Sequence, residues 1–223
     1  MMFINKLDRP GASFHLALRS ILAHRLHPNP MPLALPVASL NPHFYATGEP
    51  GVEAIVDLVK WNLWKWDQEG QSSCVPLPRT EEELAQTFAP DHPIVPHLLP
   101  ARAQLLENLS MVAPDLMDTL LALPDAPTSC LEVDSATIIG HLRTAALNNE
   151  ILPVLCGSAL KHVGTEMVMD YVGELFPNPL DRPHPPQQQS SPLQMLAWKV
   201  VWDEKKGWMT FVRVYSGKYC ASD

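Results

Sequence analysis

Glycine and paired cysteines are scarce in this sequence. Ten glycines stand against 23 prolines in 223 residues, so we expect many short segments punctuated by proline in place of a few long elements. The sequence contains no C-x-x-C, and its four cysteines are widely spaced at Cys74, Cys130, Cys156 and Cys220. This spacing argues against a secreted disulfide framework and favours reduced structural thiols, which fits an intracellular compartment.

An excess of basic residues and a long apolar run are also lacking. The net charge is −8, from 16 basic and 24 acidic residues, which argues against a large surface for bare nucleic acid. No apolar run approaches the roughly 18 residues that a membrane span needs. We therefore expect no membrane association and no sequence-specific nucleic-acid binding. The hydrophobic fraction of 46% is sufficient for a buried core.

Strand and helix signals alternate in the first part of the chain. Residues 1–4 fit the last part of a buried strand, and residues 12–26 are predicted to form a helix. Prolines at positions 28, 30 and 32 are expected to stop this helix, and residues 33–39 to form an edge strand that tolerates Pro36. The apolar face of the helix is predicted to hold Phe14, Leu18, Ile21, Leu22 and Leu26.

A second β signal covers residues 51–66, with Trp61, Leu63 and Lys65 predicted on one face and a turn at residues 67–70. The pattern of residues 81–123 is helical. Asp134 is expected to cap a further helix. The buried face of that helix is predicted to hold Ile138, Leu142 and Ala145.

The last part of the chain begins with a predicted strand over residues 151–160 that runs into a turn, followed by a helix capped by Thr165. Residues 176–192 are rich in proline and polar residues and are predicted to be a linker. Beyond them, two strand-like runs joined by residues 203–207 predict a β-hairpin.

Asn5, Lys6 and Asp8 spell N-K-x-D directly after the first predicted strand. Guanine presents a ring N–H and an exocyclic amine side by side, and the carboxylate of Asp8 can accept both. Adenine lacks this pair of donors and would leave the carboxylate without partners, so such a site discriminates strongly. Asn5 would hold the loop and reach the base edge, while Lys6 would lay its methylene stem along the ring. In isolation, N-K-x-D is more often an ordinary polar turn.

Other candidate sites have simpler explanations. The histidine pairs at positions 24/27 and 92/97 have no cysteine or carboxylate to complete a metal site, so surface or helix-end histidines are favoured. Cys156 is interpreted as a buried thiol, because no base accompanies it. The tryptophans at positions 61, 64 and 66 are interpreted as packing residues, and the acidic residues 81–83 as a solvated helix start.

Several segments resemble one family. "FINKLDRPGASF", "LNNEILPVLCGSALKHVG", "YVGELFPNPLDRP" and "KGWMTFVRVYSGK" occur in the order found in elongation factor G, a ribosomal GTPase. The resemblance covers nearly the whole chain and is strongest to the mitochondrial ribosome-releasing factor 2 branch. The segment "VDLVKWNLWKWDQEG" is most similar to fungal members.

The resemblance implies an α/β fold: the remnant of a P-loop GTPase domain with an inserted α+β subdomain, followed by the first hairpin of a β-barrel domain. Residues 1–26 and 149–178 would form the end of the GTP-binding domain, and residues 27–148 the insert. Residues 179–192 would be the linker, and residues 193–223 the start of the barrel.

The resemblance also assigns a second base-binding segment, made of Ser158, Ala159 and Leu160. The Ala159 backbone N–H would donate to the guanine oxygen, and Ser158 would orient Asp8. Two such segments, each after a strand and before a helix, favour a guanine site over a chance turn.

The motifs that bind phosphate and metal are missing. The sequence contains no G-x-x-x-x-G-K-[ST], and no D-x-x-G segment supplies the metal-side switch. The base contacts are worth roughly 0.5–1.5 kcal/mol each, whereas association costs on the order of 4–15 kcal/mol. GTP or GDP with Mg²⁺ is therefore expected to bind the intact parent and not to bind tightly to this chain. We expect the chain to be a truncated fragment, with the missing motifs encoded upstream of Met1 and preceded there by a mitochondrial presequence.

As partners, the resemblance implies the mitochondrial ribosome, including its stalk protein, and ribosome recycling factor. It also implies the mitochondrial matrix as location, and we expect a monomer. The parent function would be GTP-dependent ribosome recycling. Two alternatives remain: a non-catalytic module that binds ribosomes through the insert, and a decayed product without activity.

Overall fold

The computed structural model describes residues 1–9, 11–39, 51–67, 70–88, 92–178, 181 and 192–219. The chain divides into two compact units, Met1–Pro177 and Asn178–Asp223. The larger unit contains one parallel and one antiparallel sheet together with its helices, and the smaller contains a hairpin. The fold is therefore mixed α/β, as predicted.

The parallel sheet has three strands in the order β1 (Met2–Ile4), β7 (Leu152–Cys156) and β2 (Pro30–Pro32). Ile4 lies opposite Cys156, and Pro32 lies opposite Val154. The sequence predicted two of these strands, whereas β2 was interpreted only as a helix stop. The prolines of β2 are tolerated because it is an edge strand, where a missing N–H need not break a ladder.

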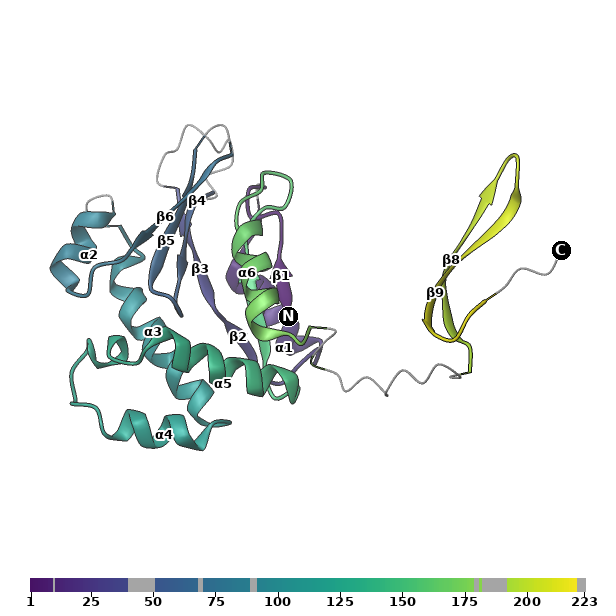
Figure 1. Ribbon diagram of the computed structural model, residues 1–223. Coiled ribbons are helices and arrows are strands. Elements are labelled where there is room, and N and C mark those ends of the chain that lie inside the picture. Colours follow the sequence, from purple (N-terminus) through teal and green to yellow (C-terminus); the bar gives the residue numbers. More distant parts are fainter. Residues whose placement is uncertain are drawn as a thin grey trace. The chain divides into compact units, whose positions relative to one another are not determined.

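The antiparallel sheet has the order β3 (Ala34–Ala38), β4 (Val52–Asp57), β5 (Asn62–Trp66) and β6 (Ser72–Pro76). Its first strand continues β2, and Figure 1 shows the two as one ribbon that passes from sheet to sheet. Leu33 makes the junction: its N–H donates to the Val154 carbonyl at 2.9 Å, and its own carbonyl accepts the Leu58 N–H at 2.9 Å. The predicted edge strand with Pro36 is confirmed.

The second β signal is two strands and not one. Asp57 Oδ1 accepts the backbone N–H groups of Val59 and Lys60 at 2.9 Å each, which builds a turn at the end of β4. Trp61 has φ of 55° and belongs to this turn. The prediction that Trp61 shares a strand face with Leu63 and Lys65 is therefore wrong.

The helices of the larger unit are α1 (Phe14–Ala23), α2 (Glu81–Thr87), α3 (Val95–Ser110), α4 (Pro114–Leu121), the 3₁₀ helix η2 (Ser129–Leu131), α5 (Ser135–Leu147) and α6 (Thr165–Leu175). Asp134 caps α5 as predicted, because its Oδ2 accepts the Ala136 N–H at 3.0 Å. Thr165 is not the cap of α6. The cap is Gly164, in the left-handed conformation with φ of 79°, and the Thr165 hydroxyl donates to the His162 carbonyl.

Helix α1 packs through a narrower stripe than predicted. Ile21 is buried and Phe14 and Leu18 are half-buried, a spacing of four and three residues along one face. Leu22 and Leu26 are 51% and 61% exposed. Leu26 follows the end of the helix, beyond Arg25 with its φ of 52°.

The smaller unit contains the hairpin of β8 (Gln194–Asp203) and β9 (Gly207–Ser216), which confirms the predicted β-hairpin. Asp203 Oδ1 accepts the N–H groups of Lys205 and Lys206 at 2.9 Å each and shapes the turn. Most of the predicted linker, and Cys220, lie outside the described residues. Among the helices that are described, none is long and apolar enough to cross a membrane.

Candidate functional site

The two predicted base-binding segments meet at the carboxyl ends of β1 and β7. Two backbone hydrogen bonds join them: the Gly157 N–H donates to the Ile4 carbonyl at 3.0 Å, and the Leu7 N–H donates to the Gly157 carbonyl at 3.1 Å. Because β1 and β7 are parallel neighbours, the loops that follow them emerge at the same edge of the sheet. In open α/β sheets, this edge is where ligands bind.

Asn5 connects the two loops through its side chain. Its Oδ1 accepts the Lys6 N–H at 2.7 Å and the Ala159 N–H at 2.9 Å. The Ala159 N–H was expected to donate to a base oxygen. In this structure it donates to Asn5 Oδ1. A bound base would have to share this N–H or displace the Asn5 amide.

The remaining residues of the two segments lie around this connection. Lys6 is exposed and has a left-handed backbone with φ of 63°. Leu160 is 77% exposed, so its side chain is available to a ligand. The loop of Ser158 is closed by two backbone hydrogen bonds with Val163, of 2.9 and 3.0 Å. All six predicted residues therefore lie on two loops that are joined to each other.

Asp8 is ionised more readily than an ordinary aspartate. The neighbouring Ser158 hydroxyl is the largest influence that lowers the pKa of Asp8, and Lys161 and Arg9 lower it further through their charges. Lys161 Nζ lies 3.8 Å from Asp8 Oδ2. Ser158 is buried, and its Oγ makes no hydrogen bond of acceptable distance and angle with the described residues. Ser158 favours the charged form of Asp8 when its hydroxyl turns to donate to the carboxylate, whereas Lys161 and Arg9 act through charge alone. A carboxylate kept charged is what two guanine N–H donors require.

Two glycines shape the second loop, and the sequence analysis did not single them out. A Cβ atom at Gly157, where φ is 154°, would lie 2.1 Å from the Val163 carbonyl oxygen. A Cβ atom at Gly164 would lie 2.6 Å from the Cys156 carbonyl oxygen. Both positions require close approach of backbone to backbone, which only glycine permits. The signal in the sequence is the pair of glycines that brackets residues 158–163.

The other candidate residues serve the fold. His27 Nδ1 accepts the Asn29 N–H at 3.0 Å and its Nε2 lies 3.1 Å from the Asn149 carbonyl, so both ring nitrogens are occupied. His92 has the same arrangement with Ile94 and Ala38. Burial raises the pKa of the Cys156 thiol, which opposes a role as nucleophile. Within the described ranges, no cluster of three His, Cys, Asp or Glu side chains could hold a metal ion.

The D-x-x-G pattern occurs twice, in positions that do not suit a phosphate switch. Residues 67–70 lie between β5 and β6, where the Gly70 N–H donates to the Asp67 carbonyl. Residues 170–173 lie inside α6. Two pockets, of about 210 and 420 Å³, are formed by other parts of the larger unit, and neither includes a residue of the two base loops.

No protein-family profile matches the sequence. A crystal structure of a protein from Thermus thermophilus is similar, with a TM-score of 0.60 and 18% sequence identity. The match covers 97% of this chain and 27% of the Thermus protein, so the chain spans about a quarter of that protein's length. At this identity the similarity establishes a shared fold.

Proposed function

We propose that this chain carries the guanine-reading end of a GTP-binding domain of the elongation factor G type, together with the subdomain inserted in it. One observation carries the proposal: Asn5 Oδ1 accepts the Ala159 N–H, which brings the two base-binding segments together beside Asp8. The residues present suit the base of GTP or GDP. The sequence has no phosphate-binding loop of the usual form, so the proposal concerns recognition of the base and not GTP hydrolysis or Mg²⁺ binding.

The parent protein would act in GTP-dependent recycling of mitochondrial ribosomes, with the ribosome and ribosome recycling factor as partners in the mitochondrial matrix. This role is proposed because four segments of the chain, "FINKLDRPGASF", "LNNEILPVLCGSALKHVG", "YVGELFPNPLDRP" and "KGWMTFVRVYSGK", occur in the order found in elongation factor G. In that setting, Asp8 selects guanine, Asn5 holds the loop after β7, and Lys6 and Leu160 flank the base. The proposal assigns no residue of this chain to the phosphates or to Mg²⁺.

Base discrimination tests the proposal directly. Guanosine, inosine and adenosine would be titrated into the full chain at millimolar concentration, and backbone amide shifts followed by NMR. We expect guanosine to shift the amides of residues 7–9 and 158–161, and adenosine to leave them unchanged. Inosine lacks the exocyclic amine and so loses one hydrogen bond to a charged group, worth about 1.5–3 kcal/mol, or roughly tenfold or more in affinity.

The Asp8→Asn variant is the matched control. Its amide can donate to the additional carbonyl of xanthine, so preference should move from guanosine to xanthosine. Equal responses to guanosine and adenosine, or an unchanged preference in Asp8→Asn, would remove the guanine site. GTP with Mg²⁺ should show no saturable binding in the micromolar range by calorimetry, since most nucleotide affinity comes from phosphate contacts.

A second candidate is a module that binds the ribosomal stalk without catalysis. It is favoured by the core of the predicted insert, because buried side chains of β3, β4, β5, α2, α3 and α5 belong to one hydrophobic cluster. The fully buried side chains of this region include Leu63, Leu84, Leu98, Leu106 and Leu142. Pull-down of purified mitochondrial ribosomes by the chain, retained in Asp8→Asn, would favour this candidate. Binding that requires guanosine nucleotides would favour the first.

A further inference from the structure

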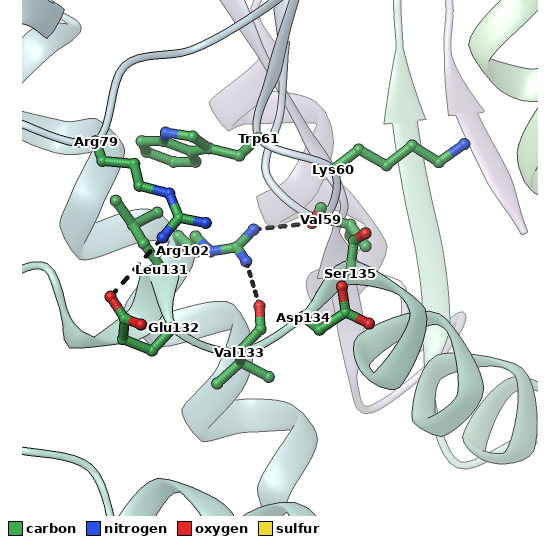
Figure 2. Close-up of a pocket in the computed structure, with 10 residues that line it drawn as sticks. All are labelled: Val59, Lys60, Trp61, Arg79, Arg102, Leu131, Glu132, Val133, Asp134 and Ser135. Carbon is green, nitrogen blue, oxygen red and sulfur yellow. Dashed lines mark hydrogen bonds and ion pairs between the residues drawn. The ribbon is translucent and has the colours of Figure 1, made fainter.

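A pocket of about 210 Å³ lies in the predicted insert, on elements other than the base loops. Figure 2 shows it between the turn after β4, the segment before α2, helix α3 and the segment that enters α5. Trp61 forms one wall, and its position is held because its Nε1–H donates to the Pro78 carbonyl at 2.8 Å. The side chains that decide its chemistry are Arg79, Arg102, Glu132 and Asp134.

Arg102 is a buried cation whose hydrogen-bond acceptors are all neutral carbonyl groups, and the carboxylate of Asp57 acts on it only through its charge. Arg102 is 3% exposed. Its Nε donates to the Cys130 carbonyl, its Nη1 to the carbonyls of Leu58 and Val59, and its Nη2 to that of Val133. Burial lowers the pKa of Arg102, because a charged guanidinium is less stable away from water.

These four hydrogen bonds use four of the N–H donors of the Arg102 guanidinium and leave one unused. A guanidinium group has five N–H donors, so one N–H of Arg102 Nη2 makes no hydrogen bond with the described residues. Carbonyl dipoles compensate only part of the desolvation of a buried cation, whereas an anion adds a stronger, charge-assisted hydrogen bond. An oxygen anion is therefore the ligand that this group would stabilise most.

Arg79 brings a second guanidinium to the same pocket. Its charge further lowers the pKa of Arg102, so the two cations lie close enough to repel each other. Figure 2 shows both groups on the same side of the Trp61 ring. The side chain of Arg79 is 70% exposed, and its ion pair with Glu132 is long at 3.9 Å. Such a pair is weak and can open to admit another anion.

The other charges around the pocket have partners that hold them in place. Asp134 Oδ2 accepts the Ala136 N–H as the cap of α5. Lys60 Nζ pairs with Glu174 at 2.7 Å, and Figure 2 shows its side chain directed away from Arg79 and Arg102. Glu132 is thus the internal group that competes most directly with a ligand for Arg79.

We propose that this pocket binds a small oxyanion, a phosphate group or a carboxylate, between Arg79 and the remaining N–H of Arg102. Glu132 competes for Arg79 and sets the affinity. The pocket, of about 210 Å³, accommodates a group of this size. The proposal is independent of the guanine site, since the two sites share no residue.

The test uses the full chain and two probes, inorganic phosphate and acetate, at constant ionic strength balanced with sodium chloride. The Nε–H signal of Arg102 and the amide signal of Ser135 would be followed by NMR. We expect saturable shifts with at least one probe. The probe that binds more tightly identifies the source: phosphate a phosphate monoester, acetate a carboxylate.

Two exposed substitutions avoid the risk that a change at the buried Arg102 unfolds the protein. Arg79→Gln should weaken binding up to about fivefold, the factor that corresponds to a surface ion pair of about 1 kcal/mol. Glu132→Gln should strengthen it by a similar factor, because the competing carboxylate is gone. Arg19→Gln is the control, because it also removes one positive charge, at an exposed position on α1. It should leave the dissociation constant unchanged.

Shifts that rise linearly with both probes and never saturate would overturn the proposal. So would an effect of Arg79→Gln no larger than that of Arg19→Gln, because binding would then reflect net charge alone. A weaker affinity in Glu132→Gln would also contradict it, since Glu132 would then support the ligand in place of competing with it.

Discussion

Asp57 Oδ1 accepts a hydrogen bond of 2.7 Å from the hydroxyl of Tyr171, and both side chains are buried. This bond links the end of β4 to helix α6, which begins directly after the second base loop. Lys60, in the turn after Asp57, pairs with Glu174 on the same helix at 2.7 Å. The antiparallel sheet and the base loop are thus connected through one helix.

Removing the Tyr171 hydroxyl should destabilise the larger unit. In Tyr171→Phe, Asp57 keeps its two backbone donors but loses its side-chain donor in a buried position. We expect the free energy of unfolding in urea to fall by about 1–3 kcal/mol. Tyr215→Phe, at a position 59% exposed on β9, is the control and should change it by less than about 0.5 kcal/mol. Equal effects of the two substitutions would show that the Asp57–Tyr171 bond contributes nothing.

The pH dependence of stability should report the burial of Asp57. Desolvation raises the pKa of Asp57, partly opposed by its hydrogen bonds to Lys60, Tyr171 and Val59. The folded state therefore holds this proton more tightly than the unfolded state. The stability contributed by Asp57 is greatest below its ordinary pKa and falls as pH rises through the raised value.

Asp57→Asn keeps an oxygen acceptor and removes this titration. Relative to the unmodified chain, the variant should therefore gain stability as pH rises from about 3 toward neutrality, a direction set by linkage. Urea unfolding at a series of pH values measures the difference. If the stability difference between the variant and the unmodified chain stays constant with pH, or changes in the other direction, burial does not raise the pKa of Asp57.

Substitution of glycine by alanine should lower stability in the base loop and raise it in helix α6. In Gly157→Ala, the added methyl group would lie 2.1 Å from the Val163 carbonyl oxygen, so the loop must shift. We expect a loss of at least about 1–3 kcal/mol, as for other strained backbone positions. Gly173→Ala, within α6 and with no atom within 4 Å of the added carbon, should instead gain roughly 0.5–1 kcal/mol. Thermal unfolding of both variants checks the contrast, which a stable Gly157→Ala would refute.

The titration of Asp8 should respond to its two neighbours in a definite order. Ser158 lowers the pKa of Asp8 more than Lys161 does, so Ser158→Ala should raise that pKa further than Lys161→Gln. The carboxyl signal of Asp8 in carbon-detected NMR gives both values. Because the pKa is lowered in the folded protein, the stability that Asp8 contributes is present above its ordinary pKa and is lost as pH falls through the lowered value. A larger rise in Lys161→Gln would mean that charge, and not the hydroxyl, controls this group.

Local patterns were sufficient for features that neighbouring residues decide. The helix start at Asp134 and the hairpin turn at residues 203–207 both depend on contacts within a few positions along the chain. The N-K-x-D segment was also identifiable, because it directly follows an apolar strand, whereas the segment of Ser158, Ala159 and Leu160 was assigned from the family resemblance. That the two segments meet depends on the parallel pairing of β1 with β7, which joins residues far apart in the sequence.

Tertiary structure decided the features whose partners are remote in sequence. β2 exists as a strand because β7 pairs with it, and no local pattern of Pro30–Pro32 reveals that partner. The turn at Trp61 is built by Asp57, whose buried carboxylate is in turn held by Tyr171, 114 residues away. Arg102 reaches carbonyls 28 to 44 residues away in sequence, so its burial and its pocket could not be predicted. Residue types and spacing determine local geometry, whereas these contacts form only when distant segments pack and exclude water from the groups between them.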